Sequence, residues 1–284
     1  MRRNPFIIAT TRLLPGWLLL FALVPMLMVL AVSVLTRDDA GFVAPVVTLD
    51  SYRRLLEPVY MHVLADSMGM AGLATLLCLL IGYPFAYLLA GVGPRWRPLL
   101  LTLVIIPFWT NSLLRVYAIR SLMAAQGPIN GVLLGLGLIH EPVRLLYTGV
   151  AVCVGLVYVL LPFMILPLYA SFDALDRRLI DAAADLGAGR RAIFRHVILP
   201  LTAPGIAAGC LLVFLPALGM FFVTDVLGGA RELMIGALLK DQFLDACDWP
   251  FGAAASVVVI GLLGLLLGLN GLLRRVLGAN QGRP

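Results

Sequence analysis

Long apolar runs dominate this chain of 284 residues and constrain its fold more than any other feature. Hydrophobic residues make up 61% of the sequence and charged residues only 13%, whereas a soluble domain has about 25% charge. A helix needs about 20 mostly apolar residues to cross a bilayer. We therefore predict an all-α membrane protein with one transmembrane domain over residues 1–284. Its six spans are expected at residues 15–36, 67–90, 99–121, 146–171, 201–225 and 251–273.

Arginines near the span ends predict the orientation of the chain. With six spans, one side holds the N-terminus, residues 91–98, residues 172–200 and the C-terminus, with thirteen basic and four acidic residues. The rest of the chain has eight basic and eleven acidic residues. Because cytoplasmic loops are enriched in Lys and Arg, both termini and residues 172–200 are predicted to be cytoplasmic. The net charge of +6 thus reflects topology, and we expect no nucleic acid as a partner.

Acidic residues gather on the predicted outer side. They are Asp38, Asp39, Asp50, Glu57, Asp66, Asp241, Asp245 and Asp248. Such a surface is either an ordinary solvated face or a mouth that raises the local concentration of a cation. The run at residues 15–36 is longer than the apolar core of a signal peptide, and no small-residue cleavage signal follows it, so we expect a retained first span.

Catalytic and metal-binding patterns do not stand out in the sequence. Cys78, Cys153, Cys210 and Cys247 have no close spacing, which argues against a metal site or a disulfide framework. His62, His140 and His196 are far apart, and no Ser-His-Asp or paired-carboxylate arrangement is visible. We therefore expect no enzyme activity and no metal in this chain.

A charged loop rich in small residues, residues 172–200, separates spans four and five. Asp176 is suited to cap a short helix from Arg177 to Leu186, and Gly187 stands where a helix-ending glycine belongs. A second helix is expected from Arg190 to Ile198, before Pro200 opens the next span. Its apolar stripe would be Ile193, Phe194, Val197 and Ile198. This predicts a helix–Gly–helix bracket, although an amphipathic loop lying on the bilayer fits the arginines too.

The same loop resembles the cytoplasmic coupling loop of ABC importer permeases, whose pattern is E-A-A, three residues, Gly, nine residues and I-x-L-P. Ala182, Ala183, Gly187, Leu199 and Pro200 match with the spacing intact. Asp181 stands in place of Glu, and Val197 in place of Ile. The resemblance implies the bundle of a type I ABC importer permease. It also implies that these seven residues couple the chain to an ATPase.

The energy source is expected in another chain. The sequence has no G-x-x-x-x-G-K-[ST] phosphate loop, and its one lysine, Lys240, lies between Leu239 and Asp241. The resemblance implies that ATP and Mg are bound and used by separate ATPase subunits, and that this chain binds no cofactor.

The wider sequence resembles the spermidine/putrescine permeases, and it looks most like the first of their two permease subunits. The resembling segments lie between Ser51 and Ala255, at residues 81–87, 107–113, 155–164, 204–225 and 248–252. The resemblance implies a heterodimer with a second permease, two ATPase subunits, an extracytoplasmic binding protein and a place in the bacterial inner membrane.

Several residues suit the passage of a polyamine, which carries spaced ammonium groups on an apolar stem. Such a path favours carboxylates and aromatic faces, because cation–π contacts strengthen when they are desolvated. We expect Asp225 to supply a carboxylate near the outer end of span five. The other candidates are Trp109, Asn111, Tyr117 and Tyr158. Arg115 and Arg120 would repel a cation if they faced the path, and would otherwise dock the binding protein or pair with carboxylates.

Two other classes of transporter compete with this interpretation. The same importer architecture serves other solutes, such as ferric iron, sulfate or an amino-acid-like compound. An ion-coupled secondary transporter would work without ATP, but such proteins often carry inverted repeats with interrupted helices. We find no such repeat in the sequence, and that class leaves the coupling loop unexplained.

Overall fold

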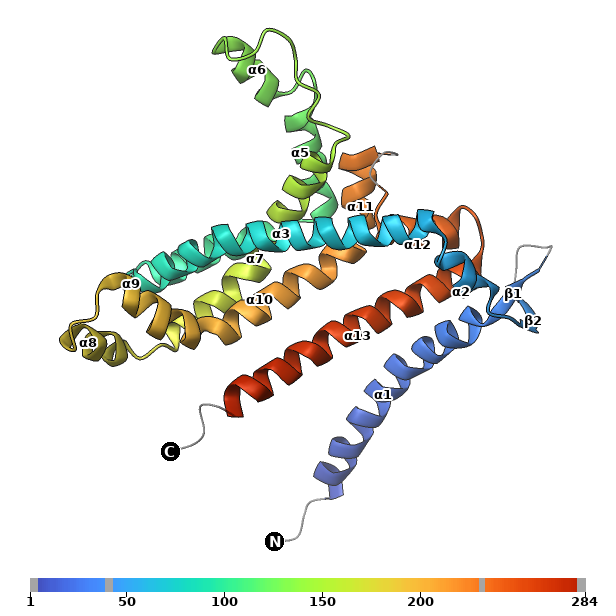
Figure 1. Cartoon of the computed structure of the whole chain (residues 1–284), viewed down its shortest axis with the longest axis horizontal. Coiled ribbons are helices and arrows are strands. Elements are labelled where there is room, and N and C mark those ends of the chain that lie inside the picture. Colours follow the sequence, from blue (N-terminus) through green and yellow to red (C-terminus); the bar gives the residue numbers. More distant parts are fainter. Residues whose placement is uncertain (1–4, 39–42, 230–232, 280–284) are drawn as a thin grey trace. The chain divides into compact units, whose positions relative to one another are not determined.

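The structure is a computed structural model that describes residues 5–38, 43–229 and 233–279 (Figure 1). Five helices are long and apolar enough to cross a membrane, and there are up to six spans if a bent helix pair counts as one. This confirms the all-α membrane class. The chain divides into two compact units, residues 1–61 with 238–284 and residues 62–237. Helices α3 (Pro58–Gly91) and α12 (Ile235–Leu244) contribute residues to both.

The first unit contains two long helices, α1 (Pro5–Ser33) and α13 (Trp249–Ala279), which pack along each other (Figure 1). After α1 come a two-stranded antiparallel hairpin, β1 (Leu35–Arg37) and β2 (Val43–Val47), and the short helix α2 (Asp50–Leu55). The buried cluster of this unit joins α2 to the start of α13 through Leu55, Phe251, Ala254 and Ala255. Only 6% of the apolar window of α1 is buried, so most of its surface is left for lipid or another chain.

The second unit is built around α3, α7 (Gly149–Asp173) and α10 (Leu199–Gly219). Small residues bring these helices close together, as is common in membranes. A Cβ at Gly205 would lie 2.9 Å from the carbonyl oxygen of Pro167, and one at Gly209 would meet the side chain of Met164 at 2.7 Å. The Cys78 Sγ of α3 donates to the carbonyl of Val157 on α7. These close approaches fix the three-helix frame that carries the functional segments.

The third predicted span is not one straight helix. Residues 99–121 are predicted to form one span, but α4 (Arg97–Trp109) and α5 (Ser112–Met123) meet at a bend of 90°. Thr110 is extended there, and the Asn111 Oδ1 accepts a hydrogen bond from the Leu113 amide at 2.9 Å. Asn111 thus caps a new helix, and the pair continues into the short α6 (Pro128–Gly135).

The fifth predicted span, residues 201–225, differs at both ends. The helix begins earlier, at Arg190, and runs to Gly219 through α9 (Arg190–Ile193), the π-helical turn η1 (Phe194–Ile198) and α10. It ends at Met220, after which come α11 (Phe221–Val223) and a second π-helical turn, η2 (Thr224–Gly228). The predicted segment therefore contains a helix end, and Asp225 lies beyond it in η2.

Candidate functional site

The segment between α7 and α10 begins with a capped helix, α8 (Arg177–Asp185). The Asp176 carboxylate accepts a hydrogen bond from the Arg178 amide at 3.0 Å, which confirms the predicted cap. At the other end, Gly187 has a φ of +81°. The Gly187 amide donates to the carbonyl of Ala184 and the Ala188 amide to that of Ala183, at 2.9 and 3.0 Å. This is a Schellman ending, so α8 has a defined start and stop.

The second arm of the bracket is continuous with the following span. Ile193 and Ile198 are buried at 9% and 5% exposure, and Val197 is half-buried, as the predicted apolar stripe requires. Phe194 is largely exposed, but its ring meets that of Tyr83 on α3 edge to face at 6.0 Å. Pro200 does not open a separate helix, because η1 passes directly into α10. The arm and the span therefore form one continuous helix that includes the π-helical turn.

The residues carried over from the coupling-loop pattern fall into two groups on this bracket. Asp181, Ala182 and Gly187 are exposed, and Ala183 is half-buried, on α8 and its C-terminal turn. Leu199 and Pro200 are exposed at the start of α10, after the half-buried Val197. α8 also contacts α9 and η1. The structure thus brings the two halves of the pattern together, and their role in coupling remains a prediction.

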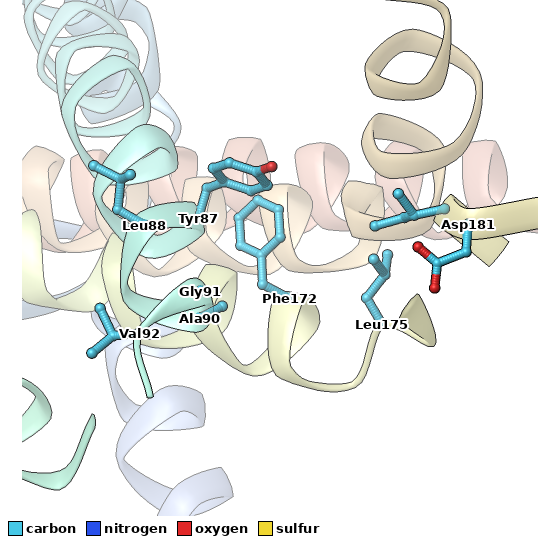
Figure 2. Close-up of a pocket in the computed structure, with 9 residues that line it drawn as sticks. Tyr87, Leu88, Ala90, Gly91, Val92, Phe172, Leu175 and Asp181 are labelled. Atoms are coloured by element: carbon cyan, nitrogen blue, oxygen red, sulfur yellow. The ribbon is translucent and has the colours of Figure 1, made fainter. Parts of the chain in front are cut away.

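A cavity of about 500 Å³ lies at the base of this bracket, inside the second unit (Figure 2). The lining residues are Tyr87, Leu88, Ala90 and Gly91 at the end of α3 with Val92 after it, Phe172 of α7 with Leu175 after that helix, and Ile180 and Asp181 of α8. Figure 2 shows the rings of Tyr87 and Phe172 beside each other near the centre of the view, with Leu175 and Asp181 to their right. The ring centroids of Tyr87 and Phe172 are 5.6 Å apart. Asp181, a coupling residue by the sequence pattern, therefore borders a mostly apolar hollow.

Arg97 ties the same region together from the start of α4. Its Nη1 donates to the Asp173 carboxylate at 2.7 Å, at the last residue of α7. Its Nε and Nη2 donate to the carbonyls of Val92 and Ala90 at 3.0 and 2.9 Å, at the end of α3. One guanidinium therefore joins the ends of two helices that frame the cavity, a contact that no local sequence pattern predicts.

The residues predicted to line a substrate path lie on α4, α5, α7 and η2 and in the break between α4 and α5. Trp109, at the end of α4, is 83% exposed, and Tyr117 on α5 and Tyr158 on α7 are 49% and 47% exposed. Asp225 is exposed in η2, which packs against α5 and α7. Asn111 uses its carbonyl oxygen as a helix cap. Within the described residues, no ring contact joins the three aromatic side chains, so a path through them stays a prediction.

Arg115 and Arg120 have different surroundings on α5. Arg120 donates from Nη2 to the Tyr147 hydroxyl at 3.1 Å. Arg115 is only 8% exposed, and within the described part of the chain its Nε and Nη1 atoms have no hydrogen-bond partner. Burial places Arg115 away from the surface that a binding protein would touch.

Tyr147 is a functional candidate that the sequence did not reveal. Its φ of +62° lies in the left-handed region, which is uncommon for a residue other than glycine. Its amide donates to the carbonyl of Leu227 in η2 at 2.8 Å, and its ring lies where a Cβ at Gly229 would be. Tyr147 therefore holds the η2 turn, and with it Asp225, against the start of α7.

The acidic residues of the predicted outer side are not uniformly solvated. Asp248 is only 4% exposed and receives a hydrogen bond from Arg54 Nη1 at 2.8 Å. Its other oxygen accepts from the Phe251 amide at 3.3 Å, at the start of α13. For Asp248 the expectation of a solvated face or a cation-concentrating mouth is wrong, because the carboxylate is neutralised inside the first unit.

Comparison with known proteins identifies the family of this chain. Residues 79–276 match the family described as binding-protein-dependent transport system inner membrane component. The spermidine/putrescine transport system permease protein PotB of Escherichia coli is 54% identical over 252 residues, which cover 89% of this chain and 92% of that protein. The protein of the same name from Haemophilus influenzae is 50% identical over 264 residues, 93% of this chain and 92% of that one.

A solved structure supports the fold independently. A chain in the crystal structure of a bacterial alginate ABC transporter, in complex with an alginate pentasaccharide-bound periplasmic protein, superposes with a TM-score of 0.76. The match covers 95% of this chain and 94% of that chain. Because the two sequences are only 17% identical, the match shows the fold alone. The family match and the identity to the curated relatives carry the assignment: this multi-pass membrane chain belongs to the family of binding-protein-dependent transport system inner membrane components.

Proposed function

We propose that this chain is one permease subunit of an ATP-driven polyamine importer, for spermidine or putrescine, in a bacterial inner membrane. The observation that carries the proposal is 54% identity, over 89% of this chain, to a protein named as a spermidine/putrescine permease. The helix–Gly–helix geometry at residues 176–200, with its capped α8 and its turn at Gly187, supports the energetic part of the proposal. Both chain ends and this bracket are assigned to the cytoplasm on the distribution of arginines.

In this proposal the chain catalyses nothing and receives work from outside. Two ATPase subunits bind ATP and Mg, and they press on the exposed face of α8, where Asp181 and Ala182 lie. The Schellman turn at Gly187 fixes the angle between α8 and the second arm. That arm is a helix of 30 residues from Arg190 to Gly219, about 45 Å long at 1.5 Å per residue. A displacement at α8 is thereby carried to the far end of α10, next to η2.

The remaining partners follow from the same architecture. A second, related permease completes the translocation path, an extracytoplasmic binding protein delivers the polyamine, and lipid covers the outer apolar surfaces. The exposed rings of Trp109, Tyr117 and Tyr158 offer faces to ammonium groups, and Asp225 offers a carboxylate near the exit of α10. Weak contacts of this kind let a cation enter and leave again.

Uptake into proteoliposomes tests this proposal. The vesicles contain this chain with the second permease and ATPases encoded beside it, with ATP inside and loaded binding protein outside. We expect labelled spermidine or putrescine to accumulate only when this chain, the binding protein and ATP are all present. Sulfate, ferric iron and an amino acid serve as competing solutes.

Two variants sharpen the test. Asp225→Asn is expected to lower polyamine uptake, whereas Asp245→Asn, at another exposed acidic residue, is expected to leave it unchanged. ATP-driven uptake of a different solute, with no uptake of polyamine, would overturn the substrate assignment but keep the importer. Polyamine uptake that needs no ATP would overturn the importer itself.

A further inference from the structure

A second cavity, of about 430 Å³, lies near the start of α3 in the second unit. Its walls come from one face of α3 and from the two residues that precede α12, with lining residues Ala65, Asp66, Gly69, Met70, Leu73, Leu233 and Met234. Asp66 is the only charged group among them, and the other walls are apolar or small. No hydrogen bond or ion pair is recorded for its exposed carboxylate within the described residues.

The wall opposite α3 is held in place by a buried hydrogen bond. The Ile235 amide donates to the Ser67 Oγ at 2.7 Å, and the Ser67 hydroxyl donates in turn to the carbonyl of Val63. Ser67 is 0% exposed, and Met234 and Ile235 are 5% and 3% exposed. The residue next to Asp66 therefore anchors the start of α12, which keeps the cavity open at a fixed width beside the carboxylate.

The location of the cavity suits the entrance of a transport path. α3 has 34 residues, about 51 Å at 1.5 Å per residue, which exceeds the hydrocarbon thickness of about 30 Å. Asp66 comes eight residues after Pro58, so it lies in the part of α3 that extends past the predicted span at residues 67–90. The predicted orientation puts this end outside the cytoplasm, where a binding protein releases its solute.

We infer that this Asp66 cavity is an entry subsite that binds one primary alkylammonium end of the substrate. The carboxylate pairs with the ammonium group, and Met70, Leu73 and Met234 contact the methylene stem. An open ion pair with a few apolar contacts gives weak binding, which suits a site that hands its ligand onward. The inference rests on the proposed polyamine import, since it names where that substrate first meets this chain.

Protection of a cysteine from a neutral maleimide tests the subsite directly. The variant Ala65→Cys places a thiol in the cavity wall, in a chain whose exposed Cys247 is changed to Ser. The complete transporter in lipid nanodiscs is labelled with or without putrescine, n-butylammonium, n-butanol or sodium chloride. At about ten times the dissociation constant, putrescine should slow labelling about tenfold, because only the empty site reacts. Butanol and sodium chloride should have no such effect.

Matched variants decide whether Asp66 is responsible. Asp66→Asn in the Ala65→Cys background should abolish the protection, and Asp66→Glu should retain it. Glu57→Gln, an exposed acidic residue of the outer side that lies outside the cavity, should leave it unchanged. Protection that survives Asp66→Asn overturns the inference. A thiol that reacts in the isolated chain but not in the assembled transporter also overturns it, because the second permease then covers the cavity.

Uptake separates this inference from the proposed function. Asp66→Asn should lower polyamine uptake several-fold in assembled transporters, with recovery in Asp66→Glu. If the Asp66→Asn variant takes up polyamine at the wild-type rate, the subsite assignment is wrong, whereas the importer assignment is unaffected. If the wild type carries no polyamine, the proposed function fails, and alkylammonium protection of the thiol still decides whether the cavity binds this chemical group.

Discussion

The Arg97 guanidinium lies 2.7 Å from the Asp173 carboxylate and also donates to the carbonyls of Ala90 and Val92. This contact joins the end of α3 to the end of α7, three residues before Asp176 caps α8. The ion pair is partly exposed, at 27% and 46% for the two side chains, so its contribution to stability is about 0.2–1 kcal/mol. Its importance is geometric, because it fixes the base from which the bracket projects.

Arg97→Lys should therefore impair coupling more than stability. A lysine keeps the charge but has no planar fork that reaches a carboxylate and two carbonyls at once. We expect a similar unfolding temperature and several-fold lower uptake per ATP hydrolysed, measured in proteoliposomes. Arg95→Lys, an exposed arginine two residues earlier, is the control. Equal uptake per ATP hydrolysed in the Arg97→Lys and Arg95→Lys variants would contradict the account.

Gly187→Val should abolish transport while leaving membrane insertion intact. The φ of +81° at Gly187 costs a residue with a Cβ about 1–2 kcal/mol, and more for a β-branched one, so α8 would lose its Schellman ending. Gly189→Val adds the same bulk where a Cβ meets no atom within 4 Å and φ is negative. Gly187→Asn should retain much of the activity, since Asn tolerates this region. Normal uptake by Gly187→Val would refute a coupling role for the turn.

Gly229→Ala should destabilise the packing of the η2 end of the second unit against Tyr147. A Cβ there would lie 2.8 Å from Tyr147 Cδ1 at a backbone φ of +61°. We expect a loss of about 1–3 kcal/mol in the free energy of unfolding, measured in detergent. In the double variant with Tyr147→Ala, removal of the ring should restore part of the lost free energy of unfolding. The part that comes from the positive φ at residue 229 should remain lost.

Gly219→Ala provides the matched control for that pair, because a Cβ at Gly219 meets no atom within 4 Å. It should leave the unfolding free energy nearly unchanged. If Gly219→Ala and Gly229→Ala were equally mild, Tyr147 would not pack against Gly229 as the structure has it.

Arg54→Met should lower the stability of the first unit. Arg54 pairs with the buried Asp248, and its Cζ lies 4.4 Å from the centroid of the Phe251 ring. Removing the arginine leaves a buried carboxylate without its main donor, which costs about 1–3 kcal/mol. Arg53→Met, at the exposed neighbour, should cost much less in the same thermal unfolding assay. Equal losses would show that the pair contributes nothing beyond the loss of a surface charge.

The direction of the pKa shift of Arg54 predicts how its pairing with Asp248 contributes to stability as pH changes. Burial lowers the pKa of Arg54, but its hydrogen bond to Asp248 and the charge of that carboxylate outweigh burial, so the pKa is raised above its usual value. A raised pKa stabilises the folded state at every pH below the pKa of the unfolded arginine, and this stabilisation is lost as pH rises through the folded pKa. The Arg54 contribution should therefore stay constant from neutral to mildly alkaline pH.

Features set by local sequence were predictable. The Asp176 cap, the glycine ending at Gly187 and the apolar runs depend on residues a few positions apart, so the sequence carries them directly. The run through Thr110 and Asn111 misled the prediction, because apolar residues continue on both sides of the break. A Thr-Asn-Ser cluster after Pro107 was the signal that a helix ends there.

Contacts between distant segments had no such local signal. Arg54 meets Asp248 across 194 residues, Ser67 meets Ile235 across 168, and Arg97 meets Asp173 across 76. In sequence, the polar side chains of these pairs look like ordinary surface or helix-end groups, and nothing marks the Ile235 amide as the partner of Ser67. Tyr147 is similar, since only the folded chain shows its left-handed backbone and its contact with η2.

The central claim is that the bracket at residues 176–200 receives the stroke of an ATPase. Cross-linking tests it most directly, with Ala182→Cys on the exposed face of α8 and single cysteines scanned over the ATPase surface. The account predicts a specific cross-link whose yield changes between ATP-bound and nucleotide-free transporter, and whose formation blocks uptake. Ala125→Cys, exposed after the end of α5, should form no cross-link. Absence of any ATPase cross-link at Ala182→Cys in an actively transporting complex would contradict the account.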